Sequence, residues 1–289
     1  MTWRLVVVIN GGQEAADQIS QPDTRREAMA NYVPISRVKH ASLHWKKPTD
    51  YGFARGEALQ PLVVAELPRV AQNMPTAFVA SGDTYVPVLL AGVRPGASLL
   101  VAADGRWLGG YVPAVLRSHP FSLLPSAAGE YVICVDAHSS FLCPDTEGLP
   151  LFSADGGASA AVSQLLPLLE RREQSRQQTE LACKALQQHG LLMPWVIPAD
   201  DATGMPEMRG LFRVDEARLN ALDDQAFLQL RQAQALPLAY SQLQSMLHLP
   251  RLAGMYREWS RNAQIADPLE GLAADAPGYA NETISFAGL

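Results

Sequence analysis

The sequence predicts an α+β fold in which a β-rich N-terminal half packs on a mostly helical C-terminal half. Two observations lead to this prediction. Residues 32–155 contain short apolar runs rich in proline and β-branched residues, which is typical of strands. Residues 160–189 have the apolar spacing of one long helix. A chain of 289 residues with 48% hydrophobic side chains has enough apolar material for a substantial core.

The β-rich half is expected to contain strands interrupted by two short helices. The predicted strands are YVPISRV (32–38), TYVPVLLAGV (84–93), SLLVAAD (98–104) and EYVICVD (130–136). Helical spacing predicts helices at 61–74, where Pro68 must bend or end the helix, and at 111–121. Asp104-Gly105 is a turn signal typical of a hairpin.

After Gly156-Gly157 the pattern becomes helical. Gly190 stands where a C′ glycine would end the long helix at 160–189. The apolar face of this helix is expected to comprise Val162, Leu165, Leu166, Leu169, Leu181, Ala182 and Leu186. The intervening ERREQSRQQTE (170–180) is polar throughout, which indicates a solvated face.

A strand pair and three further helices are expected next. The strands are MPWVIP (193–198) and MRGLFRV (208–214), on either side of the turn ADDATG. Asp215 and Asp223 are expected to cap two short helices, and 237–249 predicts a helix that ends before Pro250.

The domain organisation predicted from these patterns is one interdependent unit with a variable segment at each end. Residues 1–28 are expected to be a disordered or non-native extension, with the biological start at Met29, because nothing after Gly12 has an apolar period to bury. A β-rich region at 29–155 and a mainly helical region at 156–265 form the unit. Residues 266–289 are expected to form a loose tail.

The composition argues against nucleic-acid binding and membrane insertion. A formal net charge of -6 without a clustered basic stretch excludes the usual nucleic-acid interface. No apolar run approaches the roughly 20 residues of a spanning helix, and Leu5–Ile9 is too short for a signal peptide. Three sparsely spaced cysteines indicate reduced thiols, so a cytoplasmic location is expected.

The sequence contains no recognisable catalytic, cofactor or metal motif. G-x-S-x-G, the P-loop and G-x-G-x-x-G are all missing, which favours a protein that is not an enzyme of a familiar kind. His40 and His44 are four residues apart, and Cys134, His138 and Cys143 form a second group, but neither spacing matches a structural zinc site. No metal and no cofactor are therefore expected.

A polar and aromatic constellation in the β-rich half is the best candidate for a binding site. Its members are Tyr51, Phe53, Arg55, Glu66, Trp107, Tyr111, Arg117, His119 and Phe121. Glu66 follows Val63 and Val64 and needs a partner if buried, for which Arg55 and Arg117 are candidates. One interpretation is a structural ion pair under an aromatic cluster. The other is an aromatic groove whose arginine holds an acidic group or a peptide carboxylate.

Several ordered motifs resemble the SapC family, bacterial proteins named for a surface-array (S-layer) protein secretion cluster. The motifs are YVPIS (32–36), DYGFAR (50–55), GRWLGGYVPAVLRSHPF (105–121) and GLFRVDEARLNALDD (210–224). The resemblance runs from about Tyr32 to Leu252, and family members begin shortly before the YVPIS-like opening, which agrees with a start at Met29. It implies a role in transport or presentation of surface proteins, and it implies no catalytic residue or cofactor.

The expected function is therefore that of a soluble SapC-like accessory or binding protein with a protein or peptide partner. Its working surface is expected around Trp107, Tyr111 and Arg117. The alternative is an enzyme of unrecognised type, or the partner subunit of one, with His119 or His138 as general base near Asp136 and Glu66. A third possibility is an interaction protein that uses the helix surface from Arg171 to Glu180.

Overall fold

The structure, a computed structural model, has the predicted α+β fold and describes residues 5–6, 32–126, 130–144, 147–266 and 284–285. The chain divides into two compact units, each made of two separate segments. Unit 1 comprises Met1–Thr49 with Ala114–Ser175, and unit 2 comprises Asp50–Pro113 with Arg176–Leu289. The change of pattern at Gly156-Gly157 thus lies inside a segment of unit 1.

The predicted terminal segments lie mostly outside the described residues. Of the N-terminal extension predicted at 1–28, only Leu5 and Val6 are described, and of the tail predicted at 266–289, Ala266 and Ile284–Ser285. Both short pieces are paired, since β1 (Leu5–Val6) and β13 (Ile284–Ser285) each run parallel to a longer strand. The start at Met29 remains a prediction.

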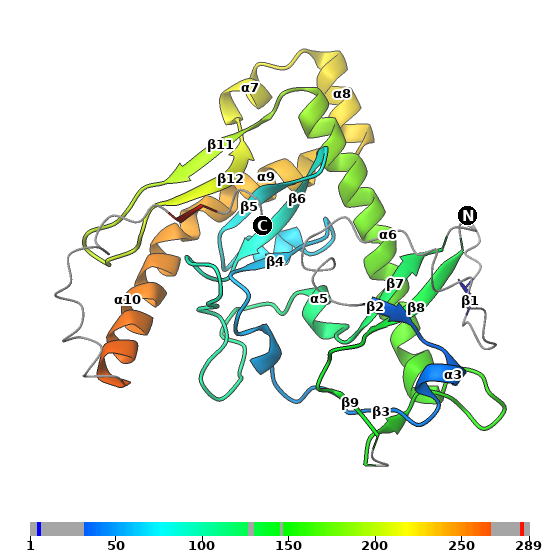
Figure 1. The fold of residues 1–289 in the computed structure, drawn as a ribbon. Coiled ribbons are helices and arrows are strands. Elements are labelled where there is room, and N and C mark those ends of the chain that lie inside the picture. Colours follow the sequence, from blue (N-terminus) through cyan, green and yellow to red (C-terminus); the bar gives the residue numbers. More distant parts are fainter. Residues whose placement is uncertain (1–4, 7–31, 127–129, 145–146, 267–283, 286–289) are drawn as a thin grey trace. The chain divides into compact units, whose positions relative to one another are not determined.

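Unit 1 is built around strand β8 (Tyr131–Asp136), which confirms the strand predicted at 130–136. β8 pairs antiparallel with β7 (Phe121–Pro125) and β2 (Tyr32–Pro34), and parallel with β1 (Figure 1). A second, small sheet has β3 (His44–Trp45) between β9 (Leu142–Cys143) and β10 (Leu149–Pro150).

The core of unit 1 joins these sheets to the first half of α6 (Ala160–Gln188). Trp45 meets the ring of Phe121 edge to face, with the centroids 5.1 Å apart. Val162 and Leu169 of α6 are buried in the same cluster, as the apolar spacing of the helix predicted. Two single-turn helices, α3 (Arg37–His40) and α5 (Ala114–Arg117), complete the unit.

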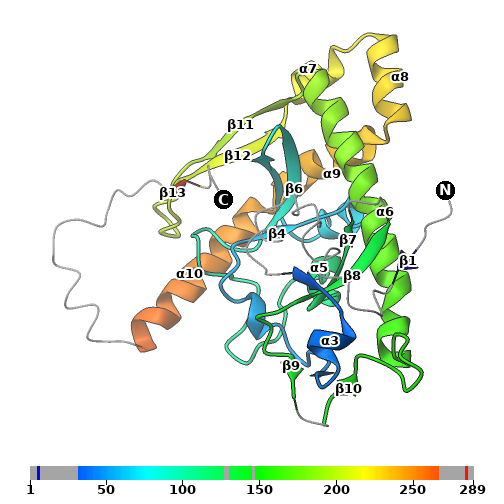
Figure 2. The ribbon, with the colours of Figure 1, turned by 45° about the vertical axis from the view of Figure 1, so that its right-hand side comes forward.

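Unit 2 contains a six-stranded sheet of order β11-β12-β5-β6-β4, with β13 beside β12 (Figure 2). The strands are β4 (Leu59–Pro61), β5 (Thr76–Ser81), β6 (Thr84–Leu90), β11 (Leu192–Ile197) and β12 (Met208–Val214). The predicted pairing of 193–198 with 208–214 is confirmed, with Leu192 opposite Val214 and Ile197 opposite Met208. β5 and β6 form a tight hairpin closed by Ser81 and Thr84.

The helices of unit 2 are α4 (Leu67–Val70), α7 (Glu216–Asn220), α8 (Asp224–Gln232), α9 (Ala235–Ser245) and α10 (Leu249–Ala266), with single 3-10 turns η1 (Gly52–Ala54) and η2 (Met246–His248). Two of these helices, α7 and α8, begin at capping aspartates. Asp215 accepts the backbone N–H of Arg218 at 3.1 Å, and Asp223 that of Ala226 at 2.8 Å, which confirms both predicted caps. Pro250 does not end a helix but lies in the first turn of α10, where a missing N–H costs nothing.

A buried glutamine connects β12, β5 and α9. Gln242 is 1% exposed, accepts the backbone N–H of Val214 at 2.9 Å and donates to the carbonyl of Thr76 at 3.2 Å. Ser245 is fully buried and accepts the backbone N–H of Thr76 at 2.9 Å. These bonds satisfy backbone groups of the sheet that would otherwise be buried without a partner.

The polar stretch of α6 is less solvated than the sequence suggests. Thr179 is buried and accepts the backbone N–H of Val64 at 2.7 Å, while the Gln178 side chain donates to the carbonyl of Ala233 at 2.9 Å. Leu181, predicted on the apolar face, is instead 58% exposed. Within the described residues, no helix has the length and apolar character that a membrane crossing requires.

Some local predictions were wrong in extent or type. The segment at 98–104 forms a loop rather than a strand, with a single bridge between Val101 and Trp107. The strand predicted at 32–38 stops at Pro34, and the helices predicted at 61–74 and 111–121 shrink to α4 and α5. Several apolar residues of these segments are buried, among them Ile35, Leu67 and Leu116, whereas Val38 is 78% exposed. Strand pairing and the proline positions limit the regular structure.

Candidate functional site

The predicted aromatic constellation is organised in unit 2 by residues 98–111, here called the aromatic loop. Two backbone bonds close its tip, from Ala102 N to Arg106 O and from Gly105 N to Ala102 O, each 2.9 Å long. At its base Leu108 N donates to the carbonyl of Leu100 at 2.8 Å. The turn expected at Asp104-Gly105 is therefore present, and it forms the tip of this loop.

Gly105 fixes the tip of the aromatic loop against the segment that precedes η1. Its φ of +84° lies in the left-handed region, which side chains with a Cβ rarely adopt. Its carbonyl accepts the backbone N–H of Tyr51 at 2.8 Å. A Cβ at this position would lie 2.7 Å from Oδ1 of Asp50, the atom that accepts the N–H of Gly52. Glycine is thus required here for both conformation and space.

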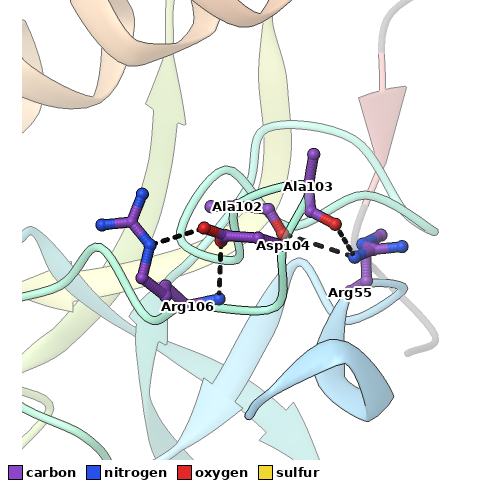
Figure 3. Close-up of polar contacts among 5 residues, drawn as sticks. All are labelled: Arg55, Ala102, Ala103, Asp104 and Arg106. Atoms are coloured by element: carbon purple, nitrogen blue, oxygen red, sulfur yellow. Dashed lines mark hydrogen bonds and ion pairs between the residues drawn. The ribbon is translucent and has the colours of Figure 1, made fainter.

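Arg55 holds the tip from one side, as Figure 3 shows. Its Nη2 donates to the carbonyl oxygens of Ala102 at 3.3 Å and Ala103 at 2.9 Å. Arg55 therefore bonds to the aromatic loop and does not form the predicted ion pair with Glu66. On the other side Arg106 Nε donates to Asp104 Oδ2 at 2.6 Å. Hydrogen bonding from Arg106 lowers the pKa of the Asp104 carboxyl. The negative charge of Asp104 and the positive charge of Arg106 therefore offset each other at the tip.

The aromatic side chains gather at the base of the aromatic loop. Trp107 Nε1 donates to the carbonyl of Tyr111 at 2.8 Å, which orients the indole ring. Tyr51 meets Trp107 edge to face at 6.0 Å between centroids, and Phe53 is 6.2 Å from Tyr51. The rings of Tyr51, Phe53, Trp107 and Tyr111 are all half-buried. Leu108, which follows Trp107 in the sequence, is 44% exposed. Tyr51, Trp107 and Tyr111, predicted as members of one constellation, are thus neighbours in the structure.

Two arginines that the sequence analysis did not select lie near this part of the loop, Arg69 beside Tyr111 and Arg251 beside Asn73. The guanidinium carbon of Arg69, in α4, is 5.9 Å from the centre of the Tyr111 ring. Arg251, in α10, donates from Nη1 to the carbonyl of Asn73 at 3.1 Å. A Cβ on Gly110 would lie 2.6 Å from Cγ of Asn73, so the aromatic loop touches that side chain closely.

Glu66 is buried beneath this region, at 4% exposed. Its Oε2 accepts the backbone N–H of Val63 at 3.2 Å, just before α4. The prediction that Glu66 needs a partner, with Arg55 and Arg117 as candidates, is met in part, since a backbone N–H is one partner. This bond closes the turn that leads into α4.

The other three predicted residues, Arg117, His119 and Phe121, belong to unit 1. Phe121 is fully buried in the core of that unit. His119 Nε2 lies 3.1 Å from the hydroxyl oxygen of Ser139, and its ring meets Phe141 edge to face at 5.8 Å. The residues of the predicted surface therefore belong to two different units. Those in unit 2 are the ones that lie around the aromatic loop.

The groups required by the catalytic alternative do not gather within one unit. His119 and Asp136 belong to unit 1 and Glu66 to unit 2. Asp136 Oδ1 accepts the backbone N–H of His138 at 3.1 Å, and the His138 side chain is exposed. Within unit 1 the His119 ring lies within hydrogen-bond distance of the Ser139 hydroxyl.

The histidines and cysteines weighed as metal ligands occupy different elements. His40 is buried in α3, where burial lowers its pKa, whereas His44 is in β3. Burial in β8 raises the pKa of the Cys134 thiol to about 12, so it stays protonated. Among the described residues, no three His, Cys, Asp or Glu side chains are arranged to hold a metal ion.

Comparison with known proteins gives one match. The model of the SapC family matches residues 35–252, which confirms the resemblance inferred from the motifs. No curated protein and no solved structure matches the chain. The matched range includes the aromatic loop, Arg69 and Arg251.

Proposed function

Because the chain belongs to the SapC family, we propose that it is a cytoplasmic accessory protein that binds a protein partner during export or uptake of a surface component. The family name suggests the cellular process. The aromatic loop, supported from Arg55, Gly105 and Trp107, supplies the binding surface.

The observation that supports this proposal is an exposed apolar residue, Leu108, on a loop whose conformation is held by its own hydrogen bonds. Leu108 is 44% exposed although its neighbour Trp107 is hydrogen-bonded and the loop base is closed. A loop held in one conformation loses little entropy on binding, so its exposed apolar surface contributes to affinity efficiently. Half-buried Tyr51, Phe53 and Tyr111 extend this surface with rings of the kind enriched at interfaces.

The test is capture of a partner by the tagged full-length chain in its own source, followed by quantitative mass spectrometry. We expect one stoichiometric protein partner with the wild type, and about tenfold less with Leu108→Ser because one leucine side chain no longer becomes buried. Leu247→Ser is the matched control, because Leu247 is 80% exposed in the same unit and outside the loop. Absence of a partner, or equal capture by both variants, would refute the proposal.

A second candidate function is favoured by the His119–Ser139 contact. With the proton of the imidazole on Nδ1, Nε2 accepts the Ser139 hydroxyl proton, and Oγ acts as nucleophile. A fluorophosphonate probe tests this, because attack by Oγ forms a P–O bond and expels fluoride. Labelling that disappears in Ser139→Ala and persists in Ser140→Ala supports a hydrolase, and an unlabelled wild type excludes it.

A further inference from the structure

The turn that follows β8 adds backbone groups to the contact between His119 and Ser139. This turn runs from Ser139 to Leu142, because the backbone N–H of Leu142 donates to the carbonyl of Ser139 at 3.2 Å. The backbone N–H of Phe141 donates to Oγ of Ser139 at 3.3 Å. Ser139 therefore stands at the start of the turn as a capping residue does, with its hydroxyl oxygen bound to the N–H two residues later.

The bond from Phe141 also affects how Oγ of Ser139 can interact with His119. It uses one lone pair of the hydroxyl oxygen, while Nε2 of His119 lies 3.1 Å from the same atom. On the N-terminal side, the N–H of Ser139 donates to the carbonyl of Asp136 at 3.1 Å. Backbone hydrogen bonds thus hold Ser139 from both directions of the chain, and a hydroxyl held in this way stays within reach of a general base.

The backbone N–H of Ser140 is the donor that this turn leaves open. Within the described residues it has no hydrogen-bond partner, whereas the N–H groups of Ser139, Phe141 and Leu142 each have one. Ser140 is exposed, so a molecule from solution can reach it. In a capped turn the first N–H groups point to the side of the capping oxygen, and successive N–H groups of this kind bind anions. The open donor therefore lies on the same side of the turn as Oγ.

We propose that the N–H of Ser140 binds the oxyanion that forms when Ser139 attacks a carboxylic ester. In serine hydrolases with a nucleophile elbow, the residue after the nucleophile supplies one oxyanion donor. This turn lacks the glycines of that motif but leaves the same N–H open. The inference rests on the second candidate function and names its substrate class. An ester with an apolar acyl group fits, because the half-buried Phe141 ring meets the His119 ring edge to face at 5.8 Å.

Acyl transfer at this turn can proceed with the groups present. The Ser139 hydroxyl proton moves to Nε2 of His119 as Oγ forms a bond to the acyl carbon, and an electron pair of the carbonyl moves onto its oxygen, beside the N–H of Ser140. The tetrahedral intermediate then collapses, the bond to the alcohol oxygen breaks, and the alcohol takes the proton from His119. Water repeats the sequence on the acyl group, which leaves as the carboxylic acid and restores Ser139.

Ser140→Pro tests the donor, because proline has no N–H and is favoured at the second position of a turn. The assay is the rate at which a fluorophosphonate probe labels the full-length chain, since the phosphoryl oxygen of the probe takes the place of the oxyanion. We expect labelling of Ser140→Pro to be about 100-fold slower than that of the wild type, and labelling of Ser140→Ala, which keeps the N–H, to stay within about threefold. Ala137→Pro is the matched control, because Ala137 is exposed and is the second residue of the turn from Asp136 to Ser139.

Two further measurements use the wild-type chain. A probe with sulfur in place of the phosphoryl oxygen accepts hydrogen bonds poorly, so the chain should prefer the oxygen probe at least about tenfold more than hydroxide does in water. For the substrate class, p-nitrophenyl hexanoate should be hydrolysed with a kcat/KM about tenfold above that of p-nitrophenyl acetate, and Phe141→Ala should reduce this preference. Equal kcat/KM for the two esters would overturn the assignment of an apolar acyl group.

The labelling results separate the oxyanion site from the candidate function on which it rests. An unlabelled wild type, or labelling that persists in Ser139→Ala, refutes the hydrolase and the oxyanion site together. Labelling of Ser140→Pro at the wild-type rate, with thermal unfolding showing that the variant folds, overturns the oxyanion site and leaves the hydrolase standing. An equal loss of labelling in Ala137→Pro, or an oxygen preference no larger than that of hydroxide, overturns the oxyanion site as well.

Discussion

Replacement of Gly105 by alanine is the sharpest test of how the aromatic loop is held. Two costs add at this position. A residue with a Cβ at a φ of +84° costs about 1–2 kcal/mol. The added Cβ would also lie 2.7–2.8 Å from three atoms of the Asp50 side chain, so Asp50 must move. Displacing Asp50 loses its hydrogen bond from Gly52, worth about 1 kcal/mol, and adds about 1–3 kcal/mol of crowding.

The expected loss in the free energy of unfolding for Gly105→Ala is therefore about 3–6 kcal/mol. Gly96→Ala is the control, because Gly96 has a φ of +80° and nothing lies within 4 Å of the Cβ it would gain. We expect this control to lose only the conformational term, about 1–2 kcal/mol. Urea unfolding followed by tryptophan fluorescence measures both values, with a common slope required for the comparison.

A double substitution then tests the cause. In an Asp50→Gly background all three of these close atoms are absent, so adding Gly105→Ala should cost no more than Gly96→Ala does. If Gly105→Ala costs the same with and without Asp50, the close approach of these two residues is not what fixes the loop, and the reasoning fails.

Three further predictions concern buried groups. Gln242→Leu should lower the free energy of unfolding by about 2–4 kcal/mol in urea titrations, because two buried backbone groups lose their partner, whereas exposed Gln244→Leu should change it by less than about 0.5 kcal/mol. Ellman's reagent at pH 8 should label Cys143 in the native chain and all three cysteines only after unfolding, since burial raises the pKa of the other two to about 12; fast labelling of three native thiols would contradict this. Because burial lowers the pKa of His40 from 6.5, folding favours the neutral ring, so stability is full above pH 6.5 and falls as the pH drops below it. His40→Asn should flatten that slope between pH 7 and 5 in thermal unfolding, and an unchanged slope would exclude His40 as its source.

The elements that the sequence predicted well are those specified by neighbouring residues. The strand pair β11–β12, the caps at Asp215 and Asp223, and the span of α6 all depend on local patterns or side chains. The strand predicted at 98–104 failed for the opposite reason. Its residues Leu99, Leu100 and Val101 are buried as strand residues would be, but a strand also needs a partner along its length, which local sequence does not specify.

The site was predictable in its aromatic part and not in its charged part. Tyr51, Trp107 and Tyr111 form a recognisable aromatic group in two short motifs, and the structure brings them together. Arg55 was predicted as a member of the site, but its acceptors are loop carbonyls that composition cannot reveal. Arg251 comes from α10, far along the chain, and only the tertiary fold brings it to Asn73.

The alternation of the two units along the chain has a consequence for synthesis and for dissection. Unit 2 receives its first strands from 50–113 and its remaining strands after residue 176, with a segment of unit 1 made in between. On the ribosome, β4, β5 and β6 must therefore wait until β12 emerges before their sheet is complete, whereas all segments of unit 1 have been translated by residue 175. No single cleavage of the backbone separates one whole unit from the other, because the segments of the two units alternate along the chain.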